Sequence, residues 1–132
     1  MPRLNYPTPI LCVKDIPRSI DYYVNQLGFE KNWDWIEPGS DEPGFASVGR
    51  DEVGLFLCRQ GQGHPGTWLY ITVDNCDELH EQFKQSGAMI KTPPTNYPWG
   101  MREMHVTDLE EHVIRFGQDI DAAPQPVRRA NA

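Results

Sequence analysis

The chain contains an approximate internal repeat, in which one pattern of residues returns after a step of 59 positions. Residues 11–15 form a short apolar run that ends in an aspartate, and the helical pattern after it ends at Gly28. Residues 70–74 form a similar run, and the helical pattern after it ends at Gly87. Internal repeats indicate a fold built from copies of one supersecondary unit. The sequence therefore predicts two similar modules that can enclose a cavity between them.

Each copy predicts one strand, one helix and three further strands. Ile16, Ile20 and Val24 recur at helical spacing, and Asn75 and Glu78 have the spacing of a capping box for the second helix. The expected strands cover residues 8–13, 29–36, 44–48 and 53–58, then 67–73, 88–91, 100–106 and 112–116. A glycine-rich joint, residues 60–66, separates the two copies. This order predicts an α+β fold of paired βαβββ modules, with curved mixed sheets and the helices outside.

Length and composition bound the kind of protein. A chain of 132 residues predicts one domain, residues 1–118, with modules at 7–59 and 67–117 and a mobile tail at 119–132. The net charge of -7 argues against nucleic acid as a partner. No apolar run is long enough to span a membrane, and the first residues lack an apolar signal segment. Three cysteines without a CxxC pair favour reduced thiols and a cytoplasmic location.

Two motifs carry a family resemblance. Residues 13–29 contain Val-Lys-Asp, Ser-Ile-Asp-Tyr-Tyr and Leu-Gly-Phe, and they resemble the opening signature of the vicinal oxygen chelate superfamily. That superfamily includes glyoxalase I, extradiol dioxygenases and bleomycin resistance proteins. Residues 100–117 resemble its final strand pair, and the Gly-x-Arg-Glu stretch there is most similar to the bleomycin resistance branch. The resemblance implies a fold of paired βαβββ modules that is often dimeric, with a pocket between curved sheets.

In the enzymes of the superfamily, a divalent metal is held by His, Gln and Glu side chains from the first and last strands of each module. Transferred to this chain, the resemblance implies ligand positions at Thr8, Phe56, Thr67 and Arg115. A hydroxyl is a poor ligand, a phenyl ring is none, and a guanidinium carries the wrong charge. We therefore expect no metal and no other cofactor.

A non-standard metal site remains an alternative, because Glu103 and His105 share one face of a predicted strand. In the structural alternative, Glu103 is hydrogen-bonded within the sheet or to Arg102 or Arg115. No arrangement typical of a catalytic nucleophile is present, so we expect no catalytic residue.

Aromatic residues are the remaining chemical resource. Trp33 and Trp35 alternate along a predicted strand and project from one face, where they either line a cleft or pack under a helix as core. Residues 97–100 predict a loop at the lip of a pocket. Carboxylates edge the same region, at Asp34, Glu37, Asp41 and Glu42. The residues predicted to line the cleft are Trp33, Trp35, Phe45, Phe56, Trp99, Met101, Glu103 and Arg115.

The favoured function is a homodimeric, bleomycin-resistance-like protein. It would bind a small aromatic or cationic ligand, such as an antibiotic to be sequestered, in a metal-free cleft. The alternative is a metal-dependent lyase, transferase or dioxygenase of the same fold with non-standard ligands.

Overall fold

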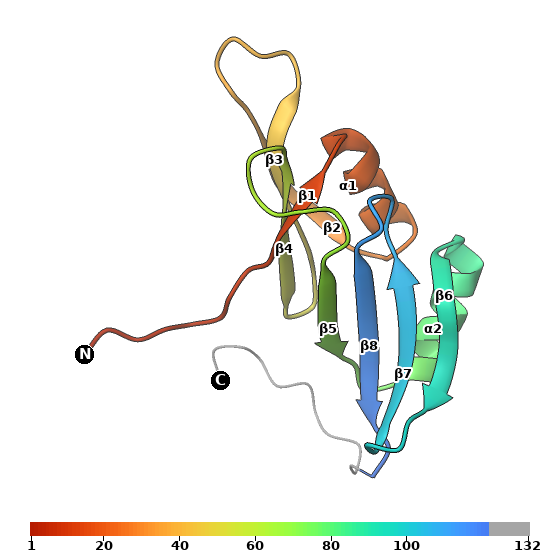
Figure 1. Cartoon of the computed structure of the whole chain (residues 1–132). Coiled ribbons are helices and arrows are strands. Elements are labelled where there is room, and N and C mark those ends of the chain that lie inside the picture. Colours follow the sequence, from red (N-terminus) through yellow and green to blue (C-terminus); the bar gives the residue numbers. More distant parts are fainter. Residues whose placement is uncertain (122–132) are drawn as a thin grey trace.

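The computed structural model describes residues 1–121 and confirms the predicted order of elements (Figure 1). The first module contains β1 (Ile10–Val13), α1 (Ile16–Asn25), β2 (Glu30–Ile36), β3 (Pro43–Arg50) and β4 (Val53–Arg59). The second module contains β5 (Trp68–Thr72), α2 (Cys76–Ser86), β6 (Met89–Asn96), β7 (Met101–Thr107) and β8 (Val113–Asp119). The predicted tail begins inside β8, and its residues 122–132 lie outside the described part of the chain.

Each module forms a four-stranded mixed sheet with the same topology. The N-terminal sheet has the order β1-β4-β3-β2, and the C-terminal sheet has the order β5-β8-β7-β6. In each sheet the first strand pairs in parallel with the last, and the other pairs are antiparallel. Prolines occur where this topology tolerates them, just before the edge strand β1 and within the edge strand β6, because an edge strand leaves one side of its backbone unpaired.

Both helices begin where local sequence chemistry predicts, and α2 also ends there, whereas α1 already ends at Asn25, before the predicted stop at Gly28. The side chain of Asp15 accepts a hydrogen bond from the Arg18 backbone N–H at 3.1 Å and caps α1. Asn75 caps α2 in the same way, by accepting from the Glu78 backbone N–H at 3.0 Å. Gly87 ends α2 in the left-handed conformation that glycine adopts without strain.

The spacing of these signals corrects one detail of the repeat. Gly28 follows the cap of α1 by 13 residues (15 to 28), whereas Gly87 follows the cap of α2 by 12 residues (75 to 87). Equivalent positions in the two modules are therefore 60 residues apart up to the helix, and 59 residues apart after it. Strand register agrees, because Ile10 pairs with Phe56 and Tyr70 pairs with Arg115.

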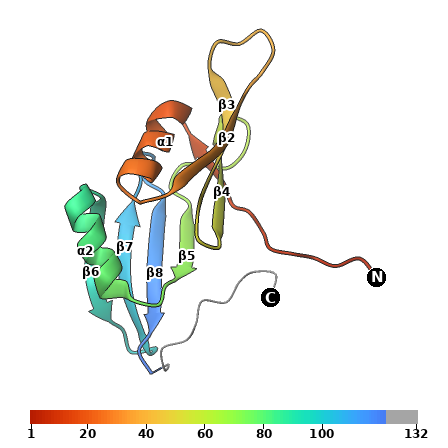
Figure 2. The same ribbon diagram turned by 180° about the vertical axis from the view of Figure 1, so that it is seen from behind.

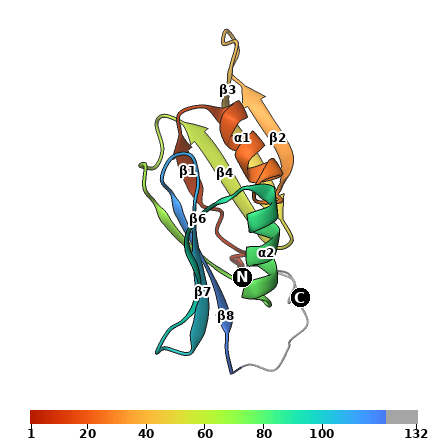
Figure 3. The ribbon, with the colours of Figure 1, turned by 90° about the vertical axis from the view of Figure 1, so that its right-hand side faces the viewer.

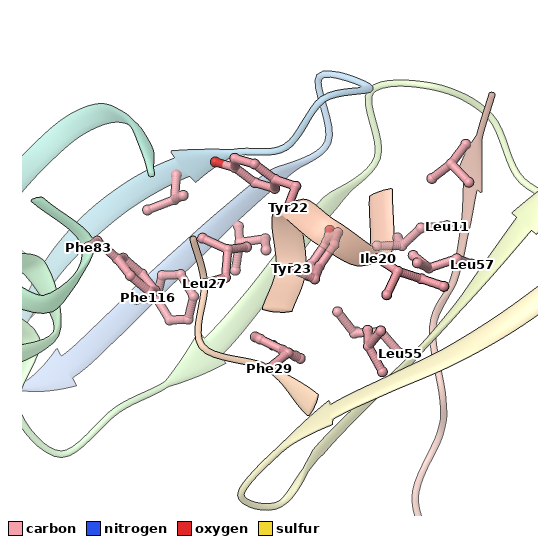
Figure 4. Close-up of a cluster of buried hydrophobic side chains, with 14 of the residues drawn as sticks. Leu11, Ile20, Tyr22, Tyr23, Leu27, Phe29, Leu55, Leu57, Phe83 and Phe116 are labelled. Atoms are coloured by element: carbon pink, nitrogen blue, oxygen red, sulfur yellow. The ribbon is translucent and has the colours of Figure 1, made fainter. Parts of the chain in front are cut away.

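One hydrophobic core runs through both modules (Figure 4). Leu11 and Leu57 of the N-terminal sheet and Phe116 of the C-terminal sheet belong to it. Two tyrosines of α1 join the modules. Tyr23 is fully buried and donates to the Asp108 carboxylate at 2.8 Å, while Tyr22 donates to a backbone carbonyl of β7 at 2.7 Å.

Each sheet has one face covered by a helix and one face left open. Helix α1 packs on β2, β3 and β4 (Figure 3), and α2 packs on β6, β7 and β8 (Figure 2). We call the opposite surfaces the N-terminal open face and the C-terminal open face. Within residues 1–121, no helix is long and apolar enough to span a membrane.

Candidate functional site

The N-terminal open face carries an aromatic shelf, which consists of Trp33, Trp35, Phe45 and Phe56. The rings of Trp33 and Phe45 are stacked, with centroids 5.9 Å apart and planes 16° apart. Phe56 contacts both, at centroid distances of 5.6 Å from Trp33 and 5.3 Å from Phe45. The shelf forms because β2, β3 and β4 are neighbours, and alternate residues on neighbouring strands share one face.

The shelf is open to solvent. Trp33 is 44% exposed and Trp35 is 53% exposed, so neither belongs to the core. A hollow of about 450 Å³ is lined by these two residues together with Asp34 and Phe45. Asp34 forms an ion pair with Lys31 at 2.9 Å. The open question about the two tryptophans is thus settled: they lie on the uncovered face, opposite α1.

The C-terminal open face is organised around one buried carboxylate. Glu103 is only 1% exposed and accepts hydrogen bonds from three side chains. The Tyr70 hydroxyl donates at 2.8 Å, the Trp99 indole N–H donates at 2.9 Å, and Arg115 forms an ion pair with it. Burial alone would raise the pKa of Glu103, but the hydrogen bonds from Arg115, Trp99 and Tyr70 outweigh burial and lower it. We call these four residues the Glu103 cluster.

A glycine makes the cluster possible. Gly117 lies beside Glu103 on the neighbouring strand. A Cβ atom built on Gly117 would lie 1.8 Å from the Tyr70 hydroxyl oxygen and 2.5 Å from its Cζ atom. The Tyr70 ring therefore crosses the β8 backbone through the space that any larger residue would fill. Burial and the bond to Glu103 raise the pKa of Tyr70 to about 12, so the phenol stays protonated and continues to donate.

Further rings extend this face. Trp99 and Tyr97 are stacked, with centroids 4.7 Å apart, and Tyr97 lies parallel to the His105 ring at 6.4 Å. Trp68 meets His105 edge-on at 5.9 Å. The Lys91 ammonium group lies 5.6 Å from the Trp68 ring centroid, within range of a cation–π contact. The turn before β7 thus stacks Tyr97 on Trp99 of the Glu103 cluster, while the role of this turn as the lip of a pocket stays a prediction.

Two polar atoms on this face have no hydrogen-bond partner within the described chain, namely His105 Nε2 and Arg115 Nε. Burial, together with the positive charge of Arg115, lowers the pKa of His105. The imidazole is therefore held neutral beside the guanidinium.

The eight residues predicted to line one cleft fall into two groups within a single chain. Trp33, Trp35, Phe45 and Phe56 form the shelf. Trp99, Glu103 and Arg115 belong to the Glu103 cluster, and Met101 lies two residues before Glu103 on the same strand. Ligand contact by these residues stays a prediction.

The sequence analysis did not include Tyr70 or Gly117 in the site. The alternation of Trp68, Tyr70 and Thr72 was a usable signal for Tyr70, because alternate strand residues share a face. The role of Gly117 depends on the path of a ring from another strand, so no local signal identifies it.

The donor set does not fit the divalent metal of the superfamily enzymes. Because the step before the helix is 60, the position equivalent to Thr8 is Trp68 rather than the predicted Thr67. The four positions are therefore Thr8, Phe56, Trp68 and Arg115, which offer a single hydroxyl as donor. Arg115 is paired with Glu103, as one structural alternative predicted. Residues 1–121 contain no group of three His, Cys, Asp or Glu side chains that could hold a metal ion.

Comparisons with known proteins agree with this architecture. The profile of the Glyoxalase/Bleomycin resistance protein/Dioxygenase superfamily matches residues 3–116. The structure is similar to TioX from Micromonospora sp. ML1, with a TM-score of 0.73 and 25% identity over 85% of this chain and 97% of that one. It is also similar to the bleomycin-binding protein of Streptomyces verticillus complexed with copper(II)-bleomycin. That match has a TM-score of 0.70 and 26% identity over 88% of this chain and 97% of that one.

A third solved structure is similar in fold. It is TnmS3, an antibiotic binding protein from Streptomyces sp. CB03234, with a TM-score of 0.73 and 23% identity over 90% of this chain and 99% of that one. No curated protein sequence matches this chain.

Proposed function

We propose, since this chain belongs to the Glyoxalase/Bleomycin resistance protein/Dioxygenase superfamily, that it is a bleomycin-resistance-type binding protein. It sequesters a planar aromatic or cationic small molecule, such as an antibiotic, without chemical turnover. The observation that carries this proposal is the aromatic shelf, whose two tryptophans are about half exposed on a face that no helix covers. The binding protein of S. verticillus, which was solved with bleomycin, supports it as a relative.

The shelf suits such a ligand for physical reasons. Its stacked rings present flat apolar surface, and stacking of one further ring contributes about 0.5–1.5 kcal/mol beyond burial. A cation over an indole gains a similar amount, about 0.5–1 kcal/mol at exposed sites. Asp34, which lines the same hollow as the two tryptophans, forms an ion pair with Lys31.

The ligand cleft belongs to a homodimer in this proposal. One chain exposes an aromatic shelf on the first sheet and stacked rings on the second, and these lie on separate open faces. A second copy would place its C-terminal open face, with Trp99 and the Glu103 cluster, against the shelf. Large exposed aromatic surfaces are typical of sites that bind a partner or a ligand. The three cysteines are unpaired, which fits the reducing cytoplasm as the location.

Isothermal titration calorimetry with metal-free bleomycin and with copper-loaded bleomycin tests the proposal. The wild type is expected to bind, and Trp33→Ala and Trp35→Ala should each weaken binding about three- to tenfold, the equivalent of one lost stacking contact. Leu109→Ala is the control, because this exposed apolar side chain lies in the turn between β7 and β8 of the C-terminal sheet and does not belong to the shelf. Affinity that is unchanged in both tryptophan variants would contradict the shelf as the binding surface.

Two further measurements separate the alternatives. Sedimentation on dilution should show a persistent dimer, and a compact monomer at micromolar concentration would contradict the shared cleft. Metal analysis of the purified protein tests the enzyme alternative. A tightly held stoichiometric divalent ion would favour a metal-dependent enzyme over a sequestering protein.

A further inference from the structure

Two cysteines stand side by side at the edge of the N-terminal open face. Cys12 in β1 and Cys58 in β4 are direct partners in the parallel ladder that joins these strands. Leu11 and Val13 point into the core, so Cys12 points to the open face, and the burial of Leu57 places Cys58 on that face as well. Both thiols are free and neighbours across the sheet.

The pair continues the aromatic shelf. Phe45 is the partner of Cys58 on the other side, in the antiparallel ladder of β3 and β4. Cys58 is 6% exposed, and its thiol donates to the Gln60 carbonyl at 3.0 Å. Gly63 of the joint packs against the outer edge of β1, because a Cβ atom placed on it would lie 3.1 Å from the Ile10 carbonyl oxygen. The Cys58 thiol is thus sheltered from solvent, and the partly exposed Cys12 beside it gives access to the pair.

Geometry decides what such a pair can bind. Neighbouring strands are about 4.8 Å apart, and Cβ atoms of in-register parallel partners keep that spacing. A disulfide needs Cβ atoms about 3.5–4.5 Å apart, so it would strain this ladder. Metal–thiolate bonds are about 2.3 Å long. Two such bonds in line, from one sulfur through the metal to the other sulfur, therefore span about 4.6 Å, which is close to the spacing between the strands.

The number of donors decides which ion fits. Structural Zn²⁺ sites need four ligands. No third His, Cys, Asp or Glu joins the pair among residues 1–121. Two thiolates favour a soft ion that accepts two-coordinate geometry, which is the behaviour of Cu(I).

We propose that Cys12 and Cys58 form a dithiolate site for a soft monovalent metal ion of the Cu(I) class. Binding converts two thiols and one Cu(I) ion into a bis-thiolate complex of charge −1 and releases two protons. Copper keeps its oxidation state, and the Cys58 thiol gives up its hydrogen bond to the Gln60 carbonyl. This site is independent of the proposed sequestering function, although it borders the same shelf.

Titration of the reduced protein with Cu(I) under anaerobic conditions, against a colorimetric Cu(I) chelator, tests the proposal. The wild type should retain one Cu(I) per chain and should not retain Zn²⁺. Cys12→Ser and Cys58→Ser should each weaken Cu(I) binding at least roughly tenfold. Cys76→Ala is the matched control, because Cys76 is buried at the start of α2 and should not contribute.

A measurement on the wild type alone keeps the test valid if a serine variant fails to fold. Bound Cu(I) should protect Cys12 and Cys58 together from alkylation, as mapped by mass spectrometry. The proposal is overturned if the wild type loses Cu(I) to the chelator, if both serine variants retain it equally well, or if alkylation of Cys12 is unchanged. Formation of a Cys12–Cys58 disulfide with glutathione disulfide, in a protein that does not retain Cu(I), would likewise overturn it.

Discussion

The substitution Gly117→Ala tests whether the Glu103 cluster depends on the absence of a side chain at position 117. The added methyl group would lie 1.8 Å from the Tyr70 hydroxyl oxygen, far inside van der Waals contact. Tyr70 is 44% exposed, so its ring can swing into solvent and relieve the overlap. The cost is then the hydrogen bond to the buried Glu103 carboxylate. Hydrogen bonds to charged groups contribute about 1.5–3 kcal/mol, and we expect a loss of that size in the free energy of unfolding.

Urea unfolding of four variants isolates this effect. Gly54→Ala is the matched control, since a Cβ atom on this strand glycine meets nothing within 4 Å, and it should change stability by less than about 0.5 kcal/mol. Tyr70→Ala removes the obstructing ring, so Gly117→Ala should cost little in that background. The reasoning is refuted if Gly117→Ala is neutral in the wild type, or if its cost is the same with and without the Tyr70 ring.

Two further predictions concern the open faces. Trp33→Ala should cost about 1–2 kcal/mol in urea unfolding, because its half-exposed ring leaves no closed cavity, whereas Leu57→Ala in the core should cost about 2–5 kcal/mol; equal losses would mark Trp33 as a core residue. Stability should fall as the pH drops from about 7 to 5, because the lowered pKa of His105 means that the unfolded chain binds a proton in this range before the folded chain does. His105→Gln should make this part of the pH profile shallower, and an unchanged slope would contradict the assignment.

Much of the fold could be predicted because its signals are local. The caps Asp15 and Asn75, the glycines after each helix and the alternation along the strands all act within a few residues of one another. The one error in the repeat has a local cause too. The segment from the capping residue to the glycine is one residue longer in the first module, although α1 has 10 residues and α2 has 11. The extra length lies after the helix, because two residues separate α1 from Gly28 whereas Gly87 directly follows α2. The positions of the caps, together with the register of β1 against β4 and of β5 against β8, show that Trp68 corresponds to Thr8.

The site was predicted less completely, because alternation shows which residues share a face but not which face a helix covers. Trp33 and Trp35 were correctly placed together, yet their exposure depended on α1 packing against the opposite side of the sheet. The Glu103 cluster depends on a ring from β5 that crosses a glycine of β8, and the thiol pair depends on the register between β1 and β4.

The sequence by itself therefore determined the two modules, the ends of their helices and the kinds of side chain on each strand face. The tertiary structure alone decided which of those faces stayed open and which distant side chains met. The physical reason is the separation along the chain of the residues that interact. Capping and strand alternation act between residues close in the chain, whereas burial, strand register and buried hydrogen bonds arise only when segments far apart in sequence pack against each other.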